Sequence, residues 1–224
     1  MLNLALSIIK QMKYILLLLT LTLSTAQASL GTFDKQGRFI YPATNKPYTG
    51  NLDVINNNWG KDAVEFNKDY VDGILHGSEK VYYQSGKLKS LGHFNQGKVD
   101  GMVELYYEDD SIQARVGFNN GTREGRAVSY YPDGTKQSEQ FYVDDKLDGL
   151  SREWFESGVL MISRDYSNGL LHGEVKTYYE SGKVFEEIRY EYGTPKLMII
   201  YNEDGAIADK KGWLDKRIIE RVVG

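Results

Sequence analysis

Residues 73–96 read Gly-Ile-Leu-His-Gly-Ser-Glu-Lys-Val-Tyr-Tyr-Gln-Ser-Gly-Lys-Leu-Lys-Ser-Leu-Gly-His-Phe-Asn-Gln, and the same pattern follows four more times without an insertion or a deletion. Each of the five copies is 24 residues long, and together they span residues 73–192. A fixed period of this length is the signature of a stacked repeat array. Function is therefore expected along a repeated surface and not in one isolated pocket.

Four features keep the same place in every copy. Two turn-forming residues, four positions apart, open each copy: Gly73/Gly77, Gly97/Gly101, Gly121/Gly125, Asp145/Gly149 and Gly169/Gly173. An aromatic pair follows: Tyr82-Tyr83, Tyr106-Tyr107, Tyr130-Tyr131, Trp154-Phe155 and Tyr178-Tyr179. A turn residue comes next, at Gly86, Asp110, Gly134, Gly158 and Gly182, and then a lone aromatic residue, at Phe94, Phe118, Tyr142, Tyr166 and Tyr190.

These features predict one β-hairpin per copy. Tyr131-Pro-Asp-Gly134 suits a type I turn followed by a glycine in the left-handed conformation, and β-branched and aromatic residues flank such turns, as strands require. With a three-residue loop, Tyr82 lies opposite Leu88, and Phe94 is expected on that same face. One hairpin alone is not stable in water. The predicted fold is therefore all-β, an elongated array of stacked β-hairpins.

Residues 49–72 follow the same register more loosely. Trp59, Asp62 and Tyr70 stand at the places of an aromatic, the turn residue and the lone aromatic, while Asp53 replaces the second glycine. An atypical unit is expected near an end of an array, because it has a neighbour on one side only.

The outer segments depart further from the pattern. Residues 33–41 resemble one hairpin, so residues 29–72 are predicted to be degenerate N-terminal hairpins. Residues 193–224 are predicted to form a degenerate half-repeat and a cap. In this last segment Leu197 occupies the second-glycine place, and Leu214, Ile218 and Val222 have the spacing of a short amphipathic helix over residues 211–223.

The first 28 residues have the organisation of an export signal. Lys10 and Lys13 form a positive region, residues 14–23 an apolar run, and Ala26-Gln27-Ala28 a cleavage site. Cleavage after Ala28 predicts a periplasmic or secreted protein, and Met12 is an alternative start. The apolar run is short for a membrane span, and an uncleaved membrane anchor is the alternative interpretation.

The charge of the mature chain limits its partners. The full chain has 27 basic and 31 acidic residues, and cleavage removes two lysines, which leaves 25 − 31 = −6. Nucleic-acid binding depends on clustered basic residues, so we expect no nucleic-acid partner. The acidic balance also disfavours association with anionic membrane surfaces. The chain has no cysteine, which excludes a disulfide framework.

One column of residues has the composition of a metal or acid–base site. It occupies the fourth place of the five copies: His76, Asp100, Glu124, Asp148 and His172. Two strands per unit separate its members by about 10 Å, whereas zinc ligands lie within about 2.3 Å of one ion. We therefore expect polar residues in the connectors, with no metal and no cofactor. No catalytic motif is present in the sequence, which favours a protein that is not an enzyme.

The pattern of paired glycines, Tyr-Tyr, a turn glycine and a lone aromatic resembles the MORN repeat, and most closely the bacterial MORN repeat variants labelled YwqK-like antitoxins. The resemblance covers residues 73–192 well and 49–72 partly. It implies a scaffold or binding module with protein or lipid partners, and the antitoxin label implies neutralisation of a partner by direct contact. One departure is that the family's aromatic residue after the second glycine is replaced here by Glu79, Val103, Ala127, Ser151 and Val175.

These observations predict an exported, non-enzymatic scaffold that contacts a protein or a glycan along its repeats. The second residue of each aromatic pair is the candidate contact: Tyr83, Tyr107, Tyr131, Phe155 and Tyr179. Two alternatives are an antitoxin-like role in the cytosol and an enzyme with its site at one end of the array, near residues 206–224. Exposed sheet ends would allow the array to form homo-oligomers.

Overall fold

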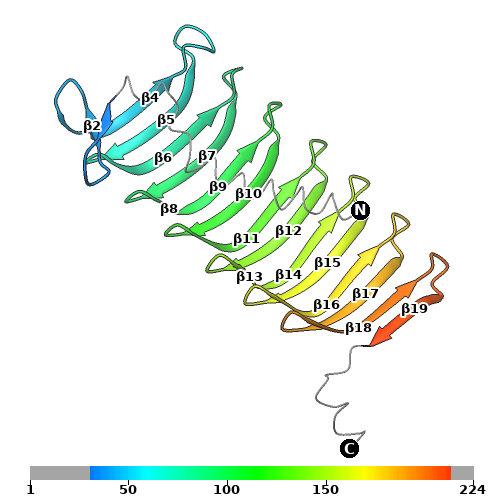
Figure 1. Ribbon diagram of the computed structural model, residues 1–224. Helices are drawn as coiled ribbons and strands as arrows, with labels where there is room; N and C mark the ends of the chain where they lie inside the picture. Colours follow the sequence, from blue (N-terminus) through cyan, green and yellow to red (C-terminus); the bar gives the residue numbers. More distant parts are fainter. Residues whose placement is uncertain (1–30, 213–224) are drawn as a thin grey trace, which may run out of the picture.

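The computed structural model describes residues 31–212, and every regular element in this range is a β-strand. Figure 1 shows an elongated, curved sheet in which the strands follow one another like the steps of a staircase. Within residues 31–212, no helix is long and apolar enough to span a membrane. The predicted all-β array of stacked hairpins is confirmed.

The main sheet has sixteen strands, all paired antiparallel and in chain order. Its N-terminal half consists of β4 (Gly50–Ile55), β5 (Val64–Val71), β6 (Ile74–Tyr82), β7 (Leu88–Asn95), β8 (Lys98–Val99), β9 (Gly101–Tyr106), β10 (Ile112–Asn119) and β11 (Thr122–Tyr130). Its C-terminal half consists of β12 (Lys136–Val143), β13 (Lys146–Leu147), β14 (Gly149–Trp154), β15 (Leu160–Ser167), β16 (Leu170–Tyr178), β17 (Val184–Glu191), β18 (Thr194–Tyr201) and β19 (Ile207–Gly212).

The hairpin tips have the predicted turn. In the first copy the Tyr83 amide donates to the Lys87 carbonyl at 2.8 Å, and the Gly86 amide donates to the Tyr83 carbonyl at 2.9 Å. Gly86 has a φ of 83° and Asp110, its equivalent, a φ of 71°, which is the left-handed conformation that the turn requires. The predicted pairing of Tyr82 with Leu88 is confirmed.

The predicted position of Phe94 is wrong. Val81 pairs with Ser90 and Tyr82 with Leu88, so the register shifts by one residue at a β-bulge. Phe94 pairs with Gly77, which lies on the same face as Val81 because side chains alternate along a strand. Phe94 is therefore on the face opposite to Tyr82. A count of residues across the turn does not reveal an extra residue in one strand.

The bulge gives the sheet two different faces. The face that carries Val81 and Phe94 and their equivalents is here called the core face. It holds the cluster of buried residues Val103, Val116, Phe118, Ala127 and Tyr142, with Val99 and Leu147 packed against it. The face that carries Tyr82 and its equivalents is here called the mixed face, because aromatic and charged side chains alternate on it.

The slot where the family's aromatic is missing lies on the core face. Its five residues, Glu79, Val103, Ala127, Ser151 and Val175, are each no more than 8% exposed. A substitution in this slot therefore changes the packing of the sheet and not an exposed binding surface.

The units are joined by one recurring backbone hydrogen bond. The amide of the first residue of a unit donates to the carbonyl of the third residue of the unit before it: Gly97 to Leu75, Gly121 to Val99, Asp145 to Arg123, Gly169 to Leu147 and Gly193 to Leu171, at 2.7–3.1 Å. Asp145 takes the place of a glycine with a φ of 64°. Asp tolerates this conformation better than most residues.

A second, three-stranded sheet covers the N-terminal end. It consists of β1 (Thr32–Phe33), β2 (Phe39–Tyr41) and β3 (Lys46–Pro47), and the β1–β2 pair confirms the hairpin predicted for residues 33–41. Phe39 is fully buried, and its ring stacks on Tyr70 at 5.3 Å. The Phe39 amide also donates to the Gly73 carbonyl at 2.8 Å, which ties the small sheet to the first connector.

The structure corrects the repeat register that the sequence predicts for residues 49–72. Asp62, with a φ of 61°, is the turn residue, and Tyr70 is the buried lone aromatic, as predicted. The second glycine is Gly50, which pairs with Tyr70, so its assignment to Asp53 is wrong. Trp59 lies in the tip loop and not on a strand, because this loop between Asn56 and Ala63 is longer than the tips of the five copies.

The C-terminal unit is a complete hairpin with a shortened connector. Arg189 pairs with Leu197 and Tyr190 with Pro195. Tyr201 and Gly205 then occupy the expected strand and turn places, and β19 completes the hairpin. Of the helix predicted over residues 211–223, Lys211 and Gly212 belong to β19 instead. The rest of that helix and the signal predicted for residues 1–28 lie outside the described residues.

Candidate functional site

The predicted contact residues form a ladder along the hairpin tips and are half-buried. The tyrosine hydroxyls donate to the backbone carbonyl of the next unit: Tyr83 to Tyr106, Tyr107 to Tyr130, Tyr131 to Trp154 and Tyr179 to Tyr201, at 2.7–2.9 Å. Burial raises the pKa of Tyr83, Tyr107 and Tyr131. Phe155 has no hydroxyl to donate. These residues hold neighbouring units together, and their polar atoms are already engaged.

The first residues of the aromatic pairs form a second row, on the mixed face. Tyr82, Tyr106, Tyr130, Trp154 and Tyr178 are half-buried there, as the tip residues are, but they lie on the open face of the sheet. Two strands per unit place neighbouring rings about 10 Å apart. The sequence alone places this row on the same face as the lone aromatic residues, because it does not reveal the bulge that puts the two sets on opposite faces.

Charged side chains fill the spaces beside this row, and they are paired. Arg115 contacts Glu104 at 2.8 Å, and Tyr106 donates to the same carboxylate at 2.8 Å. These two hydrogen bonds lower the pKa of Glu104. Lys136 lies over the Trp154 ring at 4.9 Å.

The same pairing continues toward the C-terminal end. Lys176 contacts Glu174 at 2.9 Å and Glu187 at 3.3 Å, and these contacts raise the pKa of Lys176. The mixed face therefore combines aromatic rings with largely neutralised charges.

The core face is not apolar throughout: Lys68 and Glu79 form a buried ion pair at 2.8 Å near its N-terminal end, and polar residues are buried again in the third to fifth copies. Glu153 and Arg164 form an ion pair at 2.5 Å, with side-chain exposures of 7% and 17%. Among residues 31–212, Oε2 of Glu153, Oγ of Ser151 and Oγ1 of Thr177 are buried without a hydrogen-bond partner. Such groups are uncommon because their desolvation is costly. At the ninth place of the repeat, the five copies have Val81, Leu105, Ser129, Glu153 and Thr177. The sequence therefore shows that polar residues replace apolar ones at this place from the third copy on.

The column His76, Asp100, Glu124, Asp148 and His172 has a structural role. Each side chain accepts a hydrogen bond from the last residue of its own copy: Gln96 to His76, Asn120 to Asp100, Asp144 to Glu124, Asn168 to Asp148 and Tyr192 to His172, at 2.9–3.4 Å. Those last residues have φ values of 45–50°. The column therefore caps left-handed turns. In the described part of the chain, no group of His, Asp and Glu could hold a metal ion.

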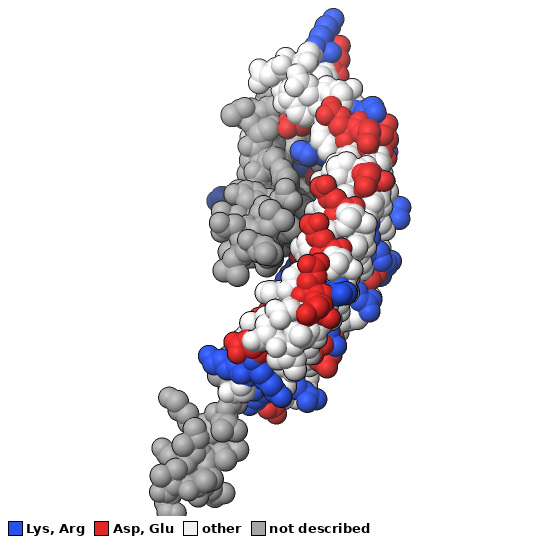
Figure 2. Space-filling model, turned by 90° about the vertical axis from the view of Figure 1, so that its right-hand side faces the viewer, with Lys and Arg blue, Asp and Glu red and all other residues white. Residues whose placement is uncertain are grey.

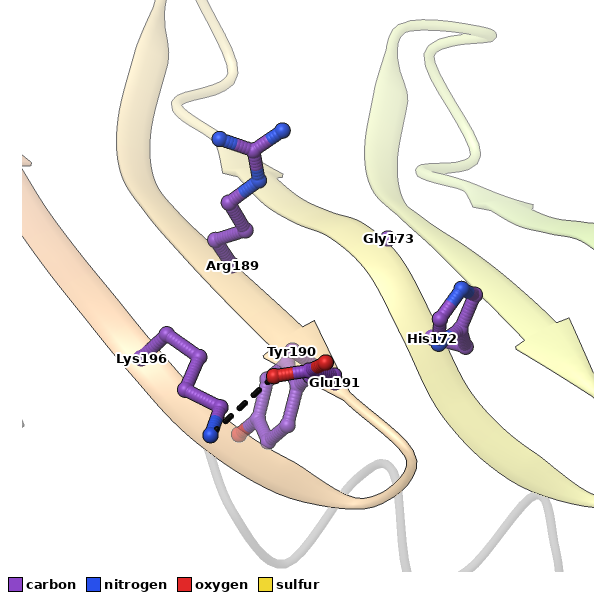
Figure 3. A pocket seen from close by; sticks show the side chains of 6 residues that line it. All are labelled: His172, Gly173, Arg189, Tyr190, Glu191 and Lys196. Carbon is purple, nitrogen blue, oxygen red and sulfur yellow. Dashed lines mark ion pairs between the residues drawn. The ribbon is translucent and has the colours of Figure 1, made fainter. Parts of the chain in front are cut away.

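A depression of about 360 Å³ lies where the connector is shortened (Figure 3). Its lining residues are His172, Gly173, Arg189, Tyr190, Glu191 and Lys196. Lys196 pairs with Glu191 at 3.1 Å, while the Arg189 guanidinium points away from this pair in Figure 3. The lining contains no Ser, Thr or Cys nucleophile, and Nδ1 of His172 accepts from the Tyr192 amide. This arrangement does not assemble a catalytic set.

Acidic side chains gather in a line along the rod in Figure 2. Exposed acidic residues occur in the tip turns of most units: Asp62, Glu108, Asp109, Asp110, Asp133, Glu156, Glu180, Glu203 and Asp204. A negative edge of this kind repels phosphate backbones.

Comparison with known protein families supports the 24-residue repeat as a MORN-like unit. Three segments, residues 75–96, 123–144 and 171–192, match the model described as the MORN repeat variant. They fall in the first, third and fifth copies, and the predicted resemblance to MORN repeats is confirmed there. Comparison with curated proteins gives no match. MORN repeats in a long antiparallel sheet indicate a repeat-based binding or scaffold protein.

Proposed function

We propose that the chain is a non-catalytic scaffold that binds an extended protein or glycan along its mixed face. The observation that carries this proposal is the row Tyr82, Tyr106, Tyr130, Trp154 and Tyr178, whose half-buried rings recur at a regular spacing on the mixed face. Aromatic side chains with a polar atom supply a large contact area and a hydrogen bond at the same position. A repeated row offers the same contact several times to one long partner.

The charges beside the row favour this class of partner. Because Glu104, Lys136 and Lys176 are engaged in ion pairs, the mixed face does not present a field of one sign. A nucleic acid would need clustered basic residues, and an anionic membrane would need the same. An extended, uncharged or mixed-charge chain fits the face better.

The cellular location of the protein distinguishes an exported scaffold from an antitoxin-like scaffold in the cytosol. Export, with cleavage after Ala28, places the partner in the periplasm or outside the cell. An antitoxin-like scaffold would instead keep its leader and meet its partner in the cytosol. Cell fractionation followed by N-terminal sequencing distinguishes them: mature material that begins at Ser29 supports export, and an intact Met1 or Met12 in the cytosol supports the alternative.

The binding face is tested with two sets of substitutions. Tyr106→Ser, Tyr130→Ser and Trp154→Ser together should abolish capture of partners from the envelope fraction that the unmodified chain retains. Tyr107→Phe with Tyr131→Phe is the control, because it removes two tip hydroxyls and leaves the mixed face intact. Equal capture by the mixed-face variant, with its fold verified by circular dichroism, would contradict the proposal. Loss of capture in the tip variant alone would move the binding site to the hairpin tips.

A further inference from the structure

The aromatic row of the mixed face alternates with a row of mostly aliphatic residues. Each ring is paired across its hairpin with one of them: Tyr82 with Leu88, Tyr106 with Ile112, Tyr130 with Lys136, Trp154 with Leu160 and Tyr178 with Val184. The strand that carries the second residue lies between one ring and the next. A partner that runs along the rod therefore meets a ring and then, in four of the five copies, an aliphatic side chain.

The spacing of the rings matches one regular peptide conformation. Equivalent residues of neighbouring units are two strands apart, which is about 9.6 Å. A polyproline II helix has three residues per turn, so every third residue returns to the same side after about 9.3 Å. The difference adds up to only about 1 Å over the four intervals from Tyr82 to Tyr178. In a β-strand, by contrast, every third residue points to the opposite side.

The polar atoms of the row are hydrogen-bond donors. Within residues 31–212, the hydroxyls of Tyr82, Tyr130 and Tyr178 and the indole N–H of Trp154 have no hydrogen-bond partner. A polyproline II helix has no internal hydrogen bonds, and proline has no backbone N–H, so a proline-rich chain presents free carbonyl acceptors. The donors of the row and the acceptors of such a chain are complementary.

The charge beside the row indicates the sign of the partner. The rings stand at the ends of their strands, next to tip turns that hold nine exposed acidic residues and three exposed lysines, which are Lys61, Lys87 and Lys183. Lys87 is already paired with Asp110 at 2.9 Å. The acidic line in Figure 2 therefore attracts basic side chains.

We propose that the mixed face binds a proline-rich segment of a partner protein in the polyproline II conformation, with a proline at every third position and Lys or Arg among the residues between. The inference rests on the proposed function and specifies the chemistry of the partner. One side of the three-sided helix places prolines between the rings, and a second side directs the basic residues to the tip turns. Four turns and one further residue, about thirteen residues, reach from Tyr82 to Tyr178.

Fluorescence anisotropy with labelled synthetic peptides tests this inference on the full chain. The probe is the 15-residue peptide (Pro-Pro-Lys)5, and (Gly-Ser-Lys)5 is the control with the same length and charge but no preformed helix. The first should bind at least about tenfold more tightly, because a preformed helix loses less conformational entropy. The acidic peptide (Pro-Pro-Glu)5 should bind more weakly than both, because the tip turns repel it.

Substitutions in the chain locate the contact. Tyr106→Ser, Tyr130→Ser and Trp154→Ser together should weaken binding of (Pro-Pro-Lys)5 about tenfold or more, since aromatic residues dominate such interfaces. Glu156→Gln with Glu180→Gln should weaken it a few-fold and leave binding of (Pro-Pro-Glu)5 no weaker. Tyr107→Phe with Tyr131→Phe is the matched control and should leave the affinity unchanged.

Equal affinities for (Pro-Pro-Lys)5 and (Gly-Ser-Lys)5 would overturn the inference, because the contact would then depend on charge alone. Unchanged binding by a folded mixed-face variant would overturn it as well. If (Pro-Pro-Lys)5 does not bind while capture from the envelope fraction still requires Tyr106, Tyr130 and Trp154, this inference alone fails and a glycan becomes the partner. Failure of both experiments would also overturn the proposed function.

Discussion

The two ends of the rod show how an array of small units is stabilised. At the N-terminal end, Phe39 is fully buried against Tyr70 and the small sheet. At the C-terminal end, the six residues of β19 are all exposed. Each unit of a repeat array contacts only its neighbours, so an end unit lacks half of the usual support. At the N-terminal end, packed aromatic rings supply part of this missing support.

The largest effect is expected from a substitution in the buried aromatic cluster of the N-terminal end. Phe39→Ala removes a fully buried ring and should lower the free energy of unfolding by about 3–5 kcal/mol. Ile207→Ala in β19 should change it by less than about 0.5 kcal/mol, because that side chain is mostly exposed. Urea denaturation of both variants measures the difference. Similar losses at the two ends would mean that the small sheet does not stabilise the array.

An intermediate effect is expected at high pH, and Tyr70 at the N-terminal end contributes to it. Burial raises the pKa of Tyr70 to about 12, from an ordinary value near 10. The folded state therefore keeps the neutral hydroxyl, and the resulting stability is complete below pH 10 and is lost as the pH rises from 10 toward 12, by about 1–2 kcal/mol. Urea denaturation at pH 8 and pH 11 should show this loss in the unmodified chain.

Tyr70→Phe serves as the control for this pH dependence. It should reduce the difference between pH 8 and pH 11 by about 1 kcal/mol, while tyrosines such as Tyr142 and Tyr166, whose pKa burial also raises, keep their own contributions. Spectrophotometric titration should lose one late-titrating tyrosine. A Tyr70 that titrates near pH 10 would show that the N-terminal end is open to water.

The smallest effect is expected at the caps of the outer connectors. Thr49 Oγ1 accepts from the Asp72 amide at 2.9 Å, and Nδ1 of His172 accepts from the Tyr192 amide at 3.4 Å. Thr49→Ala should therefore cost about 0.5–1 kcal/mol, and His172→Ala less, because longer hydrogen bonds are weaker. Amide exchange of Asp72 and Tyr192 reports each cap locally. A larger loss at His172 would indicate that the ring contact with Tyr192 outweighs the hydrogen bond.

The sequence predicts the array well because its signals are local and repeated. Paired glycines and tip turns such as Tyr131-Pro-Asp-Gly134 fix the hairpins, and five copies in register determine how they stack. The errors arise where residues are inserted, one at the bulge and three in the first tip loop. The bulge in β7 places Phe94 opposite to the expected face, and the longer loop around Trp59 moves the second glycine of that unit to Gly50.

The candidate site was harder to predict than the fold for the same reason. The two members of each aromatic pair look alike in the sequence, yet Tyr82 lies on the mixed face while Tyr83 donates to the next unit. Which of them is available to a partner depends on the hydrogen bonds between units, and these become visible only in three dimensions. The polar residue Glu153 in the core face could be predicted by comparing the residues at equivalent places of the five copies.

The central claim is that identical hairpins stack in register, and deletion of one whole repeat tests it most directly. Removal of residues 121–144 joins equivalent positions, so the shortened chain should unfold cooperatively and form a rod about 10 Å shorter by small-angle X-ray scattering. Removal of residues 121–132, half a repeat, should abolish the folded state. A whole-repeat deletion that unfolds the chain, or a half-repeat deletion that is tolerated equally well, would contradict the stacked array.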